Sequence, residues 1–142
     1  MRIVRQLLEA KRPEIFSVAP DAPVIDAIRL MAEKHVGAVL VLEGAALAGI
    51  LSERDYARKV VLEGRSSKDT AVRDIMTAEV ITVAPDDNVQ RCMQTVTRHR
   101  IRHLPVVEAG RVLGVISIGD LVAAVIEDQQ LELDQLQRYI AS

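Results

Sequence analysis

Aromatic residues are almost absent from this sequence. Phe16, Tyr56 and Tyr139 make up 2% of the 142 residues, and there is no tryptophan. A buried core must therefore consist of Val, Ile, Leu, Ala and Met side chains. The same scarcity excludes a surface that binds single-stranded nucleic acid by stacking bases on aromatic rings.

Cysteine pairs, charge of one sign and long apolar runs are missing as well. Cys92 is the only cysteine, which excludes a disulfide framework and a thiolate metal cluster. Eighteen basic and twenty acidic residues give a net charge of -2, unlike the positive excess of a nucleic-acid binder. No apolar run is long enough for a membrane span or a signal peptide. We therefore expect a cytoplasmic protein that binds neither nucleic acid nor membranes.

An internal repeat is the main feature that is present. Shifting the sequence by 65 positions places residues 15–61 over residues 80–126 without a gap. The segment VAPD occurs at 18–21 and again at 83–86. Further identical pairs are Gly49 and Gly114, Ser52 and Ser117, and Asp55 and Asp120. The chain is therefore a duplicated unit of roughly fifty residues.

Each copy begins with a pattern typical of a strand followed by a helix. The apolar run IFSVAP closes with a proline and predicts a strand. Asp21 can cap the helix that follows, with Pro23 tolerated in its first turn. The predicted apolar face of this helix consists of Val24, Ile28 and Met31, and of Val89, Met93 and Val96 in the second copy.

Each copy ends with a predicted hairpin and a second helix. AVLVL and LAGIL flank the short stretch EGAA, whose length and glycine indicate a hairpin. The last helix of the first copy starts after Ser52 and stops at Gly64. The order β-α-β-β-α, twice, predicts an α/β protein of the α+β kind.

The repeat divides the chain into five segments. A helical lead-in over 1–13 precedes the first unit over 14–63. A polar linker with a short helix over 64–79 precedes the second unit over 80–127. Residues 128–142 form a helical tail, and its apolar residues are expected to pack on their own unit in preference to a partner.

The pattern Gly-x-x-Ser-x-x-Asp, at the predicted junction of strand and helix, has two interpretations. Ser52 and Ser117 can cap the helix, with Asp55 and Asp120 completing the cap three residues later. Alternatively, the helix start can bind a phosphate while the aspartate accepts hydrogen bonds from ribose hydroxyls. Duplication copies caps and sites alike, so the pattern itself leaves both interpretations open.

The two in-register copies, each with VAPD near its start and Gly-x-x-Ser-x-x-Asp near its end, resemble a pair of CBS domains over residues 14–127. The resemblance implies that the two units pack by their sheets around a pseudo-twofold axis, leaving two clefts that hold adenosine nucleotides. Asp55 and Asp120 would then bind ribose, supported by Ser52 and Ser117. The adenine would be walled by Val18, Ala19 and Pro20 in one copy and by Val83, Ala84 and Pro85 in the other.

The basic stretch RHRIRHLP, at 98–105, fits the same resemblance. Arg102 and His103 occupy the place before a strand where the family often carries a basic residue that reaches the phosphates. Arg54 and Arg100 are further phosphate candidates, with a solvated surface charge as the alternative for each. His99 and His103 lack an acid or thiol partner, so we expect no metal site.

These observations predict a non-catalytic regulatory module that binds an adenine nucleotide. AMP is the first candidate, and ADP, ATP, NAD(H) and S-adenosylmethionine carry the same adenosine. Each copy has basic residues that the other lacks, so two unequal sites are expected. The expected partners are a second copy and an unidentified regulated protein. The alternative is a homodimerising scaffold with vestigial sites. An enzyme is disfavoured, because Cys92 and the histidines form no visible nucleophile–base set.

Overall fold

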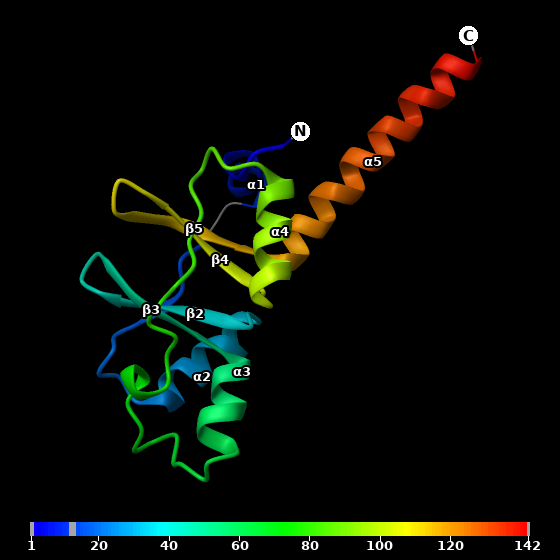
Figure 1. Ribbon diagram of the computed structural model, residues 1–142. Helices are drawn as coiled ribbons and strands as arrows, with labels where there is room; N and C mark the ends of the chain where they lie inside the picture. The colour runs from blue at the N-terminus through cyan, green and yellow to red at the C-terminus, as the bar shows by residue number, and fades with distance from the viewer. Residues whose placement is uncertain (1, 12–13, 142) are drawn as a thin grey trace. The chain divides into compact units, whose positions relative to one another are not determined.

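The computed structural model describes residues 2–11 and 14–141, and it confirms the mixed α+β class (Figure 1). The first copy follows the predicted order β-α-β-β-α. Its first strand is short, because the parallel pairing with the next strand covers only two residues. The elements are β1 (Ser17–Val18), α2 (Val24–Lys34), β2 (Ala38–Glu43), β3 (Ala46–Ser52) and α3 (Glu53–Tyr56), which continues as the π-helical turn η1 (Ala57–Val61).

In the second copy the predicted first strand is reduced to a single bridge between Val83 and Val106. The remaining elements are α4 (Val89–His99), β4 (His103–Glu108), β5 (Arg111–Ser117) and α5 (Ile118–Ala141). Two further helices lie ahead of the copies, α1 (Val4–Lys11) and the 3-10 turn η2 (Val72–Asp74). Among the residues that the structure describes, no helix has the length and apolar composition needed to cross a membrane.

The chain forms two compact units, and each contains the segment that precedes the other copy. These two segments, the described residues of 1–13 and residues 64–79, are the two lead-ins. One unit combines the described residues of 1–13 with 82–108 and 113–142, and the other combines 14–81 with 109–112. The predicted separate lead-in and linker are thus parts of these units. The segment ahead of each repeat completes the core of the opposite repeat.

The two lead-ins bind by matching backbone hydrogen bonds. The amide of Arg5 donates to the carbonyl of Pro85 over 2.8 Å, and the amide of Arg73 donates to the carbonyl of Pro20 over 2.9 Å. Fully buried side chains accompany these bonds, among them Val4 in one lead-in and Val72 in the other. The VAPD segments therefore hold the lead-ins in place.

This docking also explains why the predicted cap of α2 is wrong. Asp21 is exposed and precedes the helix start at Val24 by three residues, and no side chain caps the helix. Instead, the amide of Val24 donates to the carbonyl of Thr70, and the amide of Ile25 donates to the carbonyl of Ser67. In α4, by contrast, the side chain of Asn88 accepts the amide of Arg91.

Buried aliphatic side chains form the interior of each unit. In the first copy they come from α2, β2, β3, η1 and the docked lead-in: Val24, Ala27, Met31, Val39, Val41, Leu51, Val60, Val72 and Ile75. Ile28, predicted to belong to this core, is only half-buried. In the second copy Cys92 takes a core position on α4 beside Val89 and Val96.

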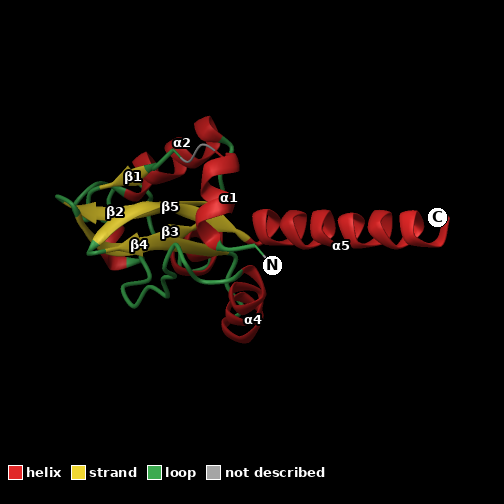
Figure 2. Ribbon diagram, turned by 90° about the horizontal axis from the view of Figure 1, so that it is seen from above, coloured by secondary structure: helices red, strands yellow, loops and turns green. Residues whose placement is uncertain are grey.

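The last helix of the second copy and the predicted tail are one continuous helix, α5 (Figure 2). Its first half packs against α4 and α1, where Leu121 and Ala124 are buried. Arg2 forms ion pairs with Glu127 and Asp128 near the middle of the helix. The expectation that the tail packs on its own unit is wrong, because its apolar side chains beyond this point are exposed: Leu131, Leu133, Leu136 and Ile140.

Candidate functional site: two Ser-x-x-Asp turns

Both Ser-x-x-Asp turns form complete helix caps. In the first copy the Asp55 amide donates to Oγ of Ser52 over 3.2 Å, and the Ser52 amide donates to Oδ2 of Asp55 over 3.0 Å. In the second copy the equivalent bonds between Asp120 and Ser117 measure 3.1 and 2.8 Å. The cap is therefore present twice, and it leaves the second oxygen of each carboxylate for other partners.

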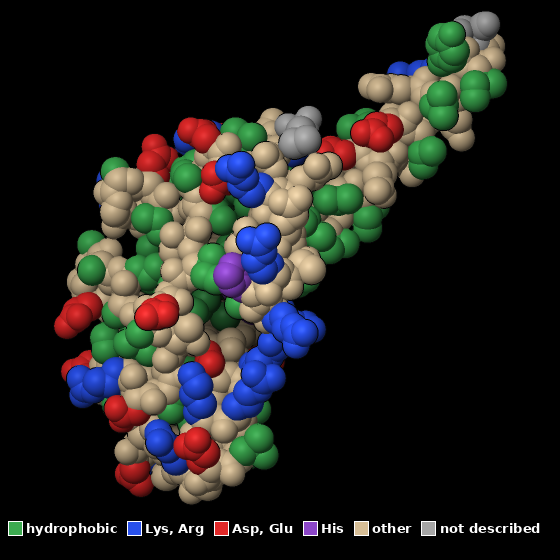
Figure 3. All heavy atoms as spheres, viewed as in Figure 1, with side chains coloured by type: hydrophobic (Ala, Val, Ile, Leu, Met, Phe, Trp, Pro, Cys, Tyr) green, Lys and Arg blue, Asp and Glu red, His purple; other side chains and the backbone are tan. Residues whose placement is uncertain are grey.

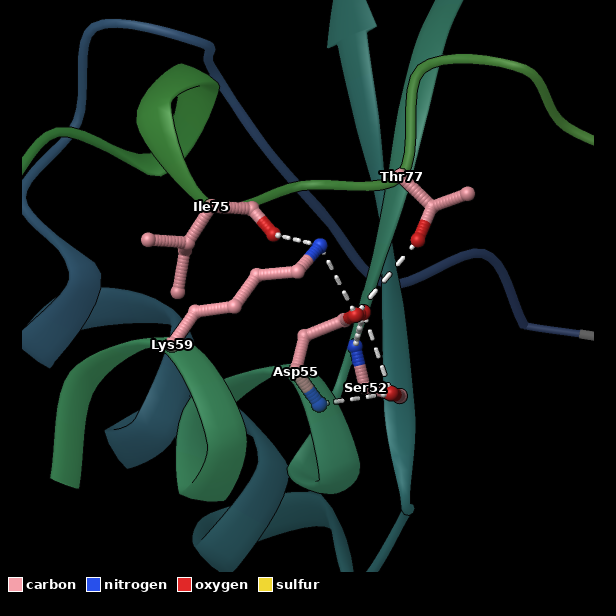
Figure 4. A network of polar contacts seen from close by, with 5 residues as sticks. All are labelled: Ser52, Asp55, Lys59, Ile75 and Thr77. Atoms are coloured by element: carbon pink, nitrogen blue, oxygen red, sulfur yellow. Dashed lines mark hydrogen bonds and ion pairs between the residues drawn. The ribbon is translucent and has the colours of Figure 1, made fainter. Parts of the chain in front are cut away.

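In the first copy that second oxygen is engaged (Figure 4). Oδ1 of Asp55 accepts a hydrogen bond from Oγ1 of Thr77 at 3.4 Å and lies 3.3 Å from Nζ of Lys59. Lys59 also donates to the carbonyl of Ile75 over 3.0 Å. Thr77 thus contacts Asp55 directly, while Ile75 binds the lysine beside it, and the Asp55 side chain is 15% exposed.

Gly49 allows this lead-in to lie against β3. The Ile50 amide donates to the Thr77 carbonyl over 3.0 Å, and the Thr77 amide returns a bond to Ile50 over 2.9 Å. A Cβ atom at Gly49 would lie 2.7 Å from Sδ of Met76 and 2.8 Å from the Thr77 carbonyl oxygen. Because Gly49 has no side chain, another group can approach its backbone closely, and here that group is the protein's own segment at Met76 and Thr77.

In the second copy the carboxylate meets a lysine from a distant part of the chain. Nζ of Lys11, at the end of α1, lies 2.7 Å from Oδ2 of Asp120 and also donates to the carbonyl of Val115 over 2.7 Å. Among the described residues no contact to Oδ1 of Asp120 is recorded, and the side chain is 28% exposed. This leaves Oδ1, on a partly exposed side chain, without a contact from the described residues.

Charge fixes the protonation state of Asp120. Burial alone would raise its pKa, but hydrogen bonds from Lys11 and from the Ser117 backbone outweigh burial and hold the pKa below its ordinary value. The carboxylate is therefore ionised at neutral pH and accepts hydrogen bonds only.

Arg102 and His103 lie beside this turn. The amide of Ile118, the first residue of α5, donates to the carbonyl of Arg102 over 2.9 Å, as the Glu53 amide does to Gly37 in the first copy. Burial lowers the pKa of His103, and the charges of Lys11 and Arg102 lower it further, while Asp120 opposes them. His103 is therefore neutral at pH 7 and surrounded by two cations and one carboxylate.

The other phosphate candidates lie on exposed helix ends. Arg54 is the second residue of α3 and is exposed. Arg100 follows α4 with a left-handed backbone (φ 54°), and its amide donates to the carbonyl of Val96. A phosphate role for either residue stays a prediction.

The six residues predicted to wall the adenine alternate in burial. Ala19 and Ala84 are exposed, while Val83 and Pro85 are buried. Val18 and Pro20, the equivalents of these two buried residues in the first copy, are half-buried. The alternation leaves one small exposed residue in each copy as a surface for a ligand. Contact with adenine stays a prediction.

Cys92 has the properties of a packing residue. Its side chain is buried, and burial together with the nearby Asp87 raises the pKa of its thiol to about 11. A thiol of this kind is protonated at neutral pH and is a poor nucleophile. Among the described residues no cluster of His, Cys, Asp and Glu is suited to a metal ion.

Sequence reasoning missed Lys59 and Lys11. Lys59 lies four residues after Asp55, a spacing that brings side chains together on a helix, so the signal was available. Lys11 is separated from Asp120 by 109 residues, and no local pattern relates the two.

Comparison with known proteins places these features in a family. The model of the CBS domain matches residues 4–62 and 72–127. The mitochondrial CBS domain-containing protein CBSX3 of Arabidopsis thaliana is 49% identical over 125 residues, which cover 84% of this chain and 61% of the plant protein. The chain therefore spans about three fifths of that relative's length.

Two solved structures are similar to this chain. One, of a putative signal-transduction protein with CBS domains from Burkholderia ambifaria, is 53% identical with a TM-score of 0.86, and the match covers 90% of this chain and 96% of the other. The other, a CBS domain protein from Pyrobaculum aerophilum complexed with AMP, is 29% identical with a TM-score of 0.75, and the match covers 84% and 89%. Together with the duplicated caps, these matches show that the chain belongs to the CBS-domain family and consists of a pair of CBS domains.

Proposed function

We propose that this CBS pair is a non-catalytic sensor of adenosine nucleotides, with AMP as the first candidate and ADP, ATP or NAD(H) as the others. The proposal places the regulated partner on another chain and the protein in the cytoplasm. The related structure from Pyrobaculum aerophilum, solved with AMP, supports the ligand class.

One observation carries the proposal, namely the second oxygen of Asp120. Oδ2 is held by Ser117 and Lys11, whereas no described residue contacts Oδ1. Because a carboxylate oxygen is a strong acceptor, vicinal ribose hydroxyls fit this position well. Asp120 would bind the ribose through Oδ1 without breaking its cap.

The surrounding charges suit the phosphate of the same ligand. Lys11 supplies an ammonium group at the turn, and Arg102 and His103 are held next to it by the start of β4. A phosphate between these groups would gain charge-assisted hydrogen bonds. We therefore propose the second copy as the stronger site.

The first copy is the weaker site in this proposal. Both oxygens of Asp55 are already engaged, and Thr77 and Lys59 would have to give up their contacts before ribose hydroxyls could bind. These contacts support the proposal that the two sites are unequal.

Thermal unfolding with AMP, ADP, ATP, NADH and S-adenosylmethionine tests the proposal. A ligand at about one hundred times its Kd stabilises the folded state by about 2.7 kcal/mol, which shifts Tm by several degrees. The wild type is compared with Asp55→Ala and Asp120→Ala, and with Glu132→Ala as a remote control. Each ligand-induced shift is measured from the variant's own ligand-free Tm, because loss of a cap itself costs about 1 kcal/mol.

We expect AMP to raise the Tm of the wild type and of Glu132→Ala equally. Asp120→Ala should lose most of this shift, and Asp55→Ala should lose less. If none of the five ligands shifts the wild-type Tm, the Ser-x-x-Asp turns act only as helix caps, and the assembly scaffold becomes the better description.

A further inference from the structure

The helix α5 carries a mostly apolar seam with the spacing of a coiled coil. The residues of this seam follow one another along the helix at alternating intervals of four and three residues. Hydrophobic side chains that alternate in this way form a stripe along one helix face, which packs against a similar stripe. The seam consists of Val122, Ile126, Gln129, Leu133, Leu136 and Ile140.

The apolar seam residues are exposed. Ile126, Leu133, Leu136 and Ile140 have exposed fractions between 53% and 75%. Figure 3 shows hydrophobic side chains lying along this helix in contact with solvent. Residues 128–141 also lie outside the segment that matches the CBS domain, which ends at residue 127. The part of the seam from Gln129 to Ile140 therefore lies beyond the matched CBS segment, and its apolar side chains are exposed in the folded chain.

Charge argues against a lipid surface or nucleic acid as the occupant. Between residues 127 and 141 the helix carries four acidic side chains, Glu127, Asp128, Glu132 and Asp134, and one basic side chain, Arg138. The resulting local charge of -3 repels anionic lipid headgroups and phosphates. Most of these acidic side chains lie away from the seam, and the positions beside it hold Gln130, Glu132 and Gln137, so another helix can approach the seam with only one charge at its edge.

Gln129 favours a second copy of α5 as that helix. It occupies one of the positions that face the partner, where a carboxamide needs a polar counterpart. The seam positions form two alternating sets, one with Gln129 and Leu136 and the other with Ile126, Leu133 and Ile140. In an antiparallel pair each set faces the other, so Gln129 would face one of these three aliphatic residues. In a parallel pair in register it meets its own counterpart, and each amide can donate to the other's carbonyl oxygen.

The residues beside the seam allow the parallel arrangement. Glu132 on one edge would face Gln137 of the second copy, one heptad further along. The amide can donate to the carboxylate, and no two acidic side chains face each other across the seam. We propose that this seam joins two copies of the chain as a short parallel coiled coil in register.

The length of the seam sets the expected affinity. From Val122 to Ile140 it covers 19 residues, and the 18 steps between them span roughly 27 Å at about 1.5 Å per residue. Two and a half heptads form a small interface, so we expect a concentration-dependent dimer with a Kd of about 1–100 μM. Sedimentation equilibrium of the full chain across this range measures it.

Leu133 and Leu131 offer a matched pair of variants. Both side chains are 53% exposed on the same helix, but only Leu133 lies on the seam. Leu133→Glu should raise the Kd of the dimer at least about hundredfold, because two carboxylates would face each other. Leu131→Glu should change it less than about threefold. Circular dichroism confirms that both variants keep their helix content.

A cross-linking experiment tests the parallel register. Leu136→Cys should form a disulfide between two copies under mild oxidation, whereas Leu131→Cys should not, and the buried Cys92 leaves the wild type unlinked. A wild type that is monomeric at about 100 μM, or equal dimer affinities for Leu133→Glu and Leu131→Glu, would overturn the proposed interface. Equal cross-linking of the two cysteine variants would overturn the parallel register. Neither result depends on nucleotide binding.

Discussion

The two copies place the same serine and aspartate at the start of their last helices, yet the two carboxylates have different neighbours. Asp55 is surrounded by Thr77 and Lys59, while Asp120 meets Lys11 and keeps one oxygen without a recorded contact among the described residues. The alignment places Ala124 opposite Lys59, so the lysines did not arise from one ancestral position. Duplication preserved the cap, and the surroundings of the carboxylate changed separately.

The largest effect is expected at Gly49, where the lead-in closes over the first turn. Gly49→Ala would force Met76 and Thr77 away from β3 and should lower the free energy of unfolding by about 1–3 kcal/mol. Urea denaturation measures this change. At Gly119 a new Cβ atom would have its nearest neighbour at 3.5 Å, so Gly119→Ala should cause no loss and gain up to about 1 kcal/mol of helix propensity. Equal stabilities of the two variants would argue against a tight lead-in.

The two lysines should differ in their effect on nucleotide binding. If Lys11 helps to bind phosphate, Lys11→Met should weaken AMP binding about tenfold, because a charge-assisted hydrogen bond is lost. Lys59→Met should leave the affinity within about twofold, since Lys59 serves the weaker site. Isothermal titration calorimetry measures both. A larger effect of Lys59→Met would reverse the proposed order of the sites.

His103 should make the second site sensitive to pH. Burial and two nearby cations lower its pKa, so it is neutral in the free protein at pH 7, and a bound phosphate would favour its protonation. Nucleotide binding would then take up a proton, and the affinity should rise about three- to tenfold as the pH falls from about 7.5 to about 6.

Two histidine variants isolate this effect. His103→Gln should flatten the pH profile, whereas His99→Gln, at the exposed end of α4, should retain it. Titrations at several pH values compare the two. A profile that stays steep in His103→Gln would place the titrating group elsewhere.

The smallest expected effect is a change in the free energy of unfolding at acidic pH. The pKa of Asp120 is lower in the folded chain than its ordinary value of 3.8, so its contribution to stability is complete above that pH. It should be lost as the pH falls through the folded-state pKa, and it should amount to no more than about 1 kcal/mol because the pair with Lys11 is partly exposed. Asp120→Asn should reduce the slope of stability against pH below about 4. Lys11→Met should do the same, and an unchanged slope in both variants would contradict this assignment.

The sequence revealed the repeat, the order of elements and the capping of the last helices, because each depends on local spacing. Caps formed by Ser52 and Ser117 need only the next three residues, and the structure contains both. The expectation for Asp21 was wrong because backbone carbonyls from residues 67 and 70 cap α2, and their approach is a tertiary event. Local patterns do not contain such partners.

The same limit applies to the site. Asp55 and Asp120 followed from the motif, whereas Lys11 comes from a segment that belongs to the opposite repeat in sequence. The tail was expected to pack on its own unit because apolar spacing alone does not distinguish a helix that packs internally from one that binds a partner. Exposure of Leu133 and Leu136 in the folded chain makes that distinction.

The exchange of lead-ins has a consequence for how such a chain arose. A single repeat with its own lead-in would leave the buried positions of Val4, Leu7 and Leu8, or of Val72 and Ile75, unfilled. Two identical single-repeat chains could fill these buried positions for each other by exchanging their N-terminal segments. Fusing two such chains would convert the swapped dimer into one polypeptide with the arrangement of lead-ins that the present chain has.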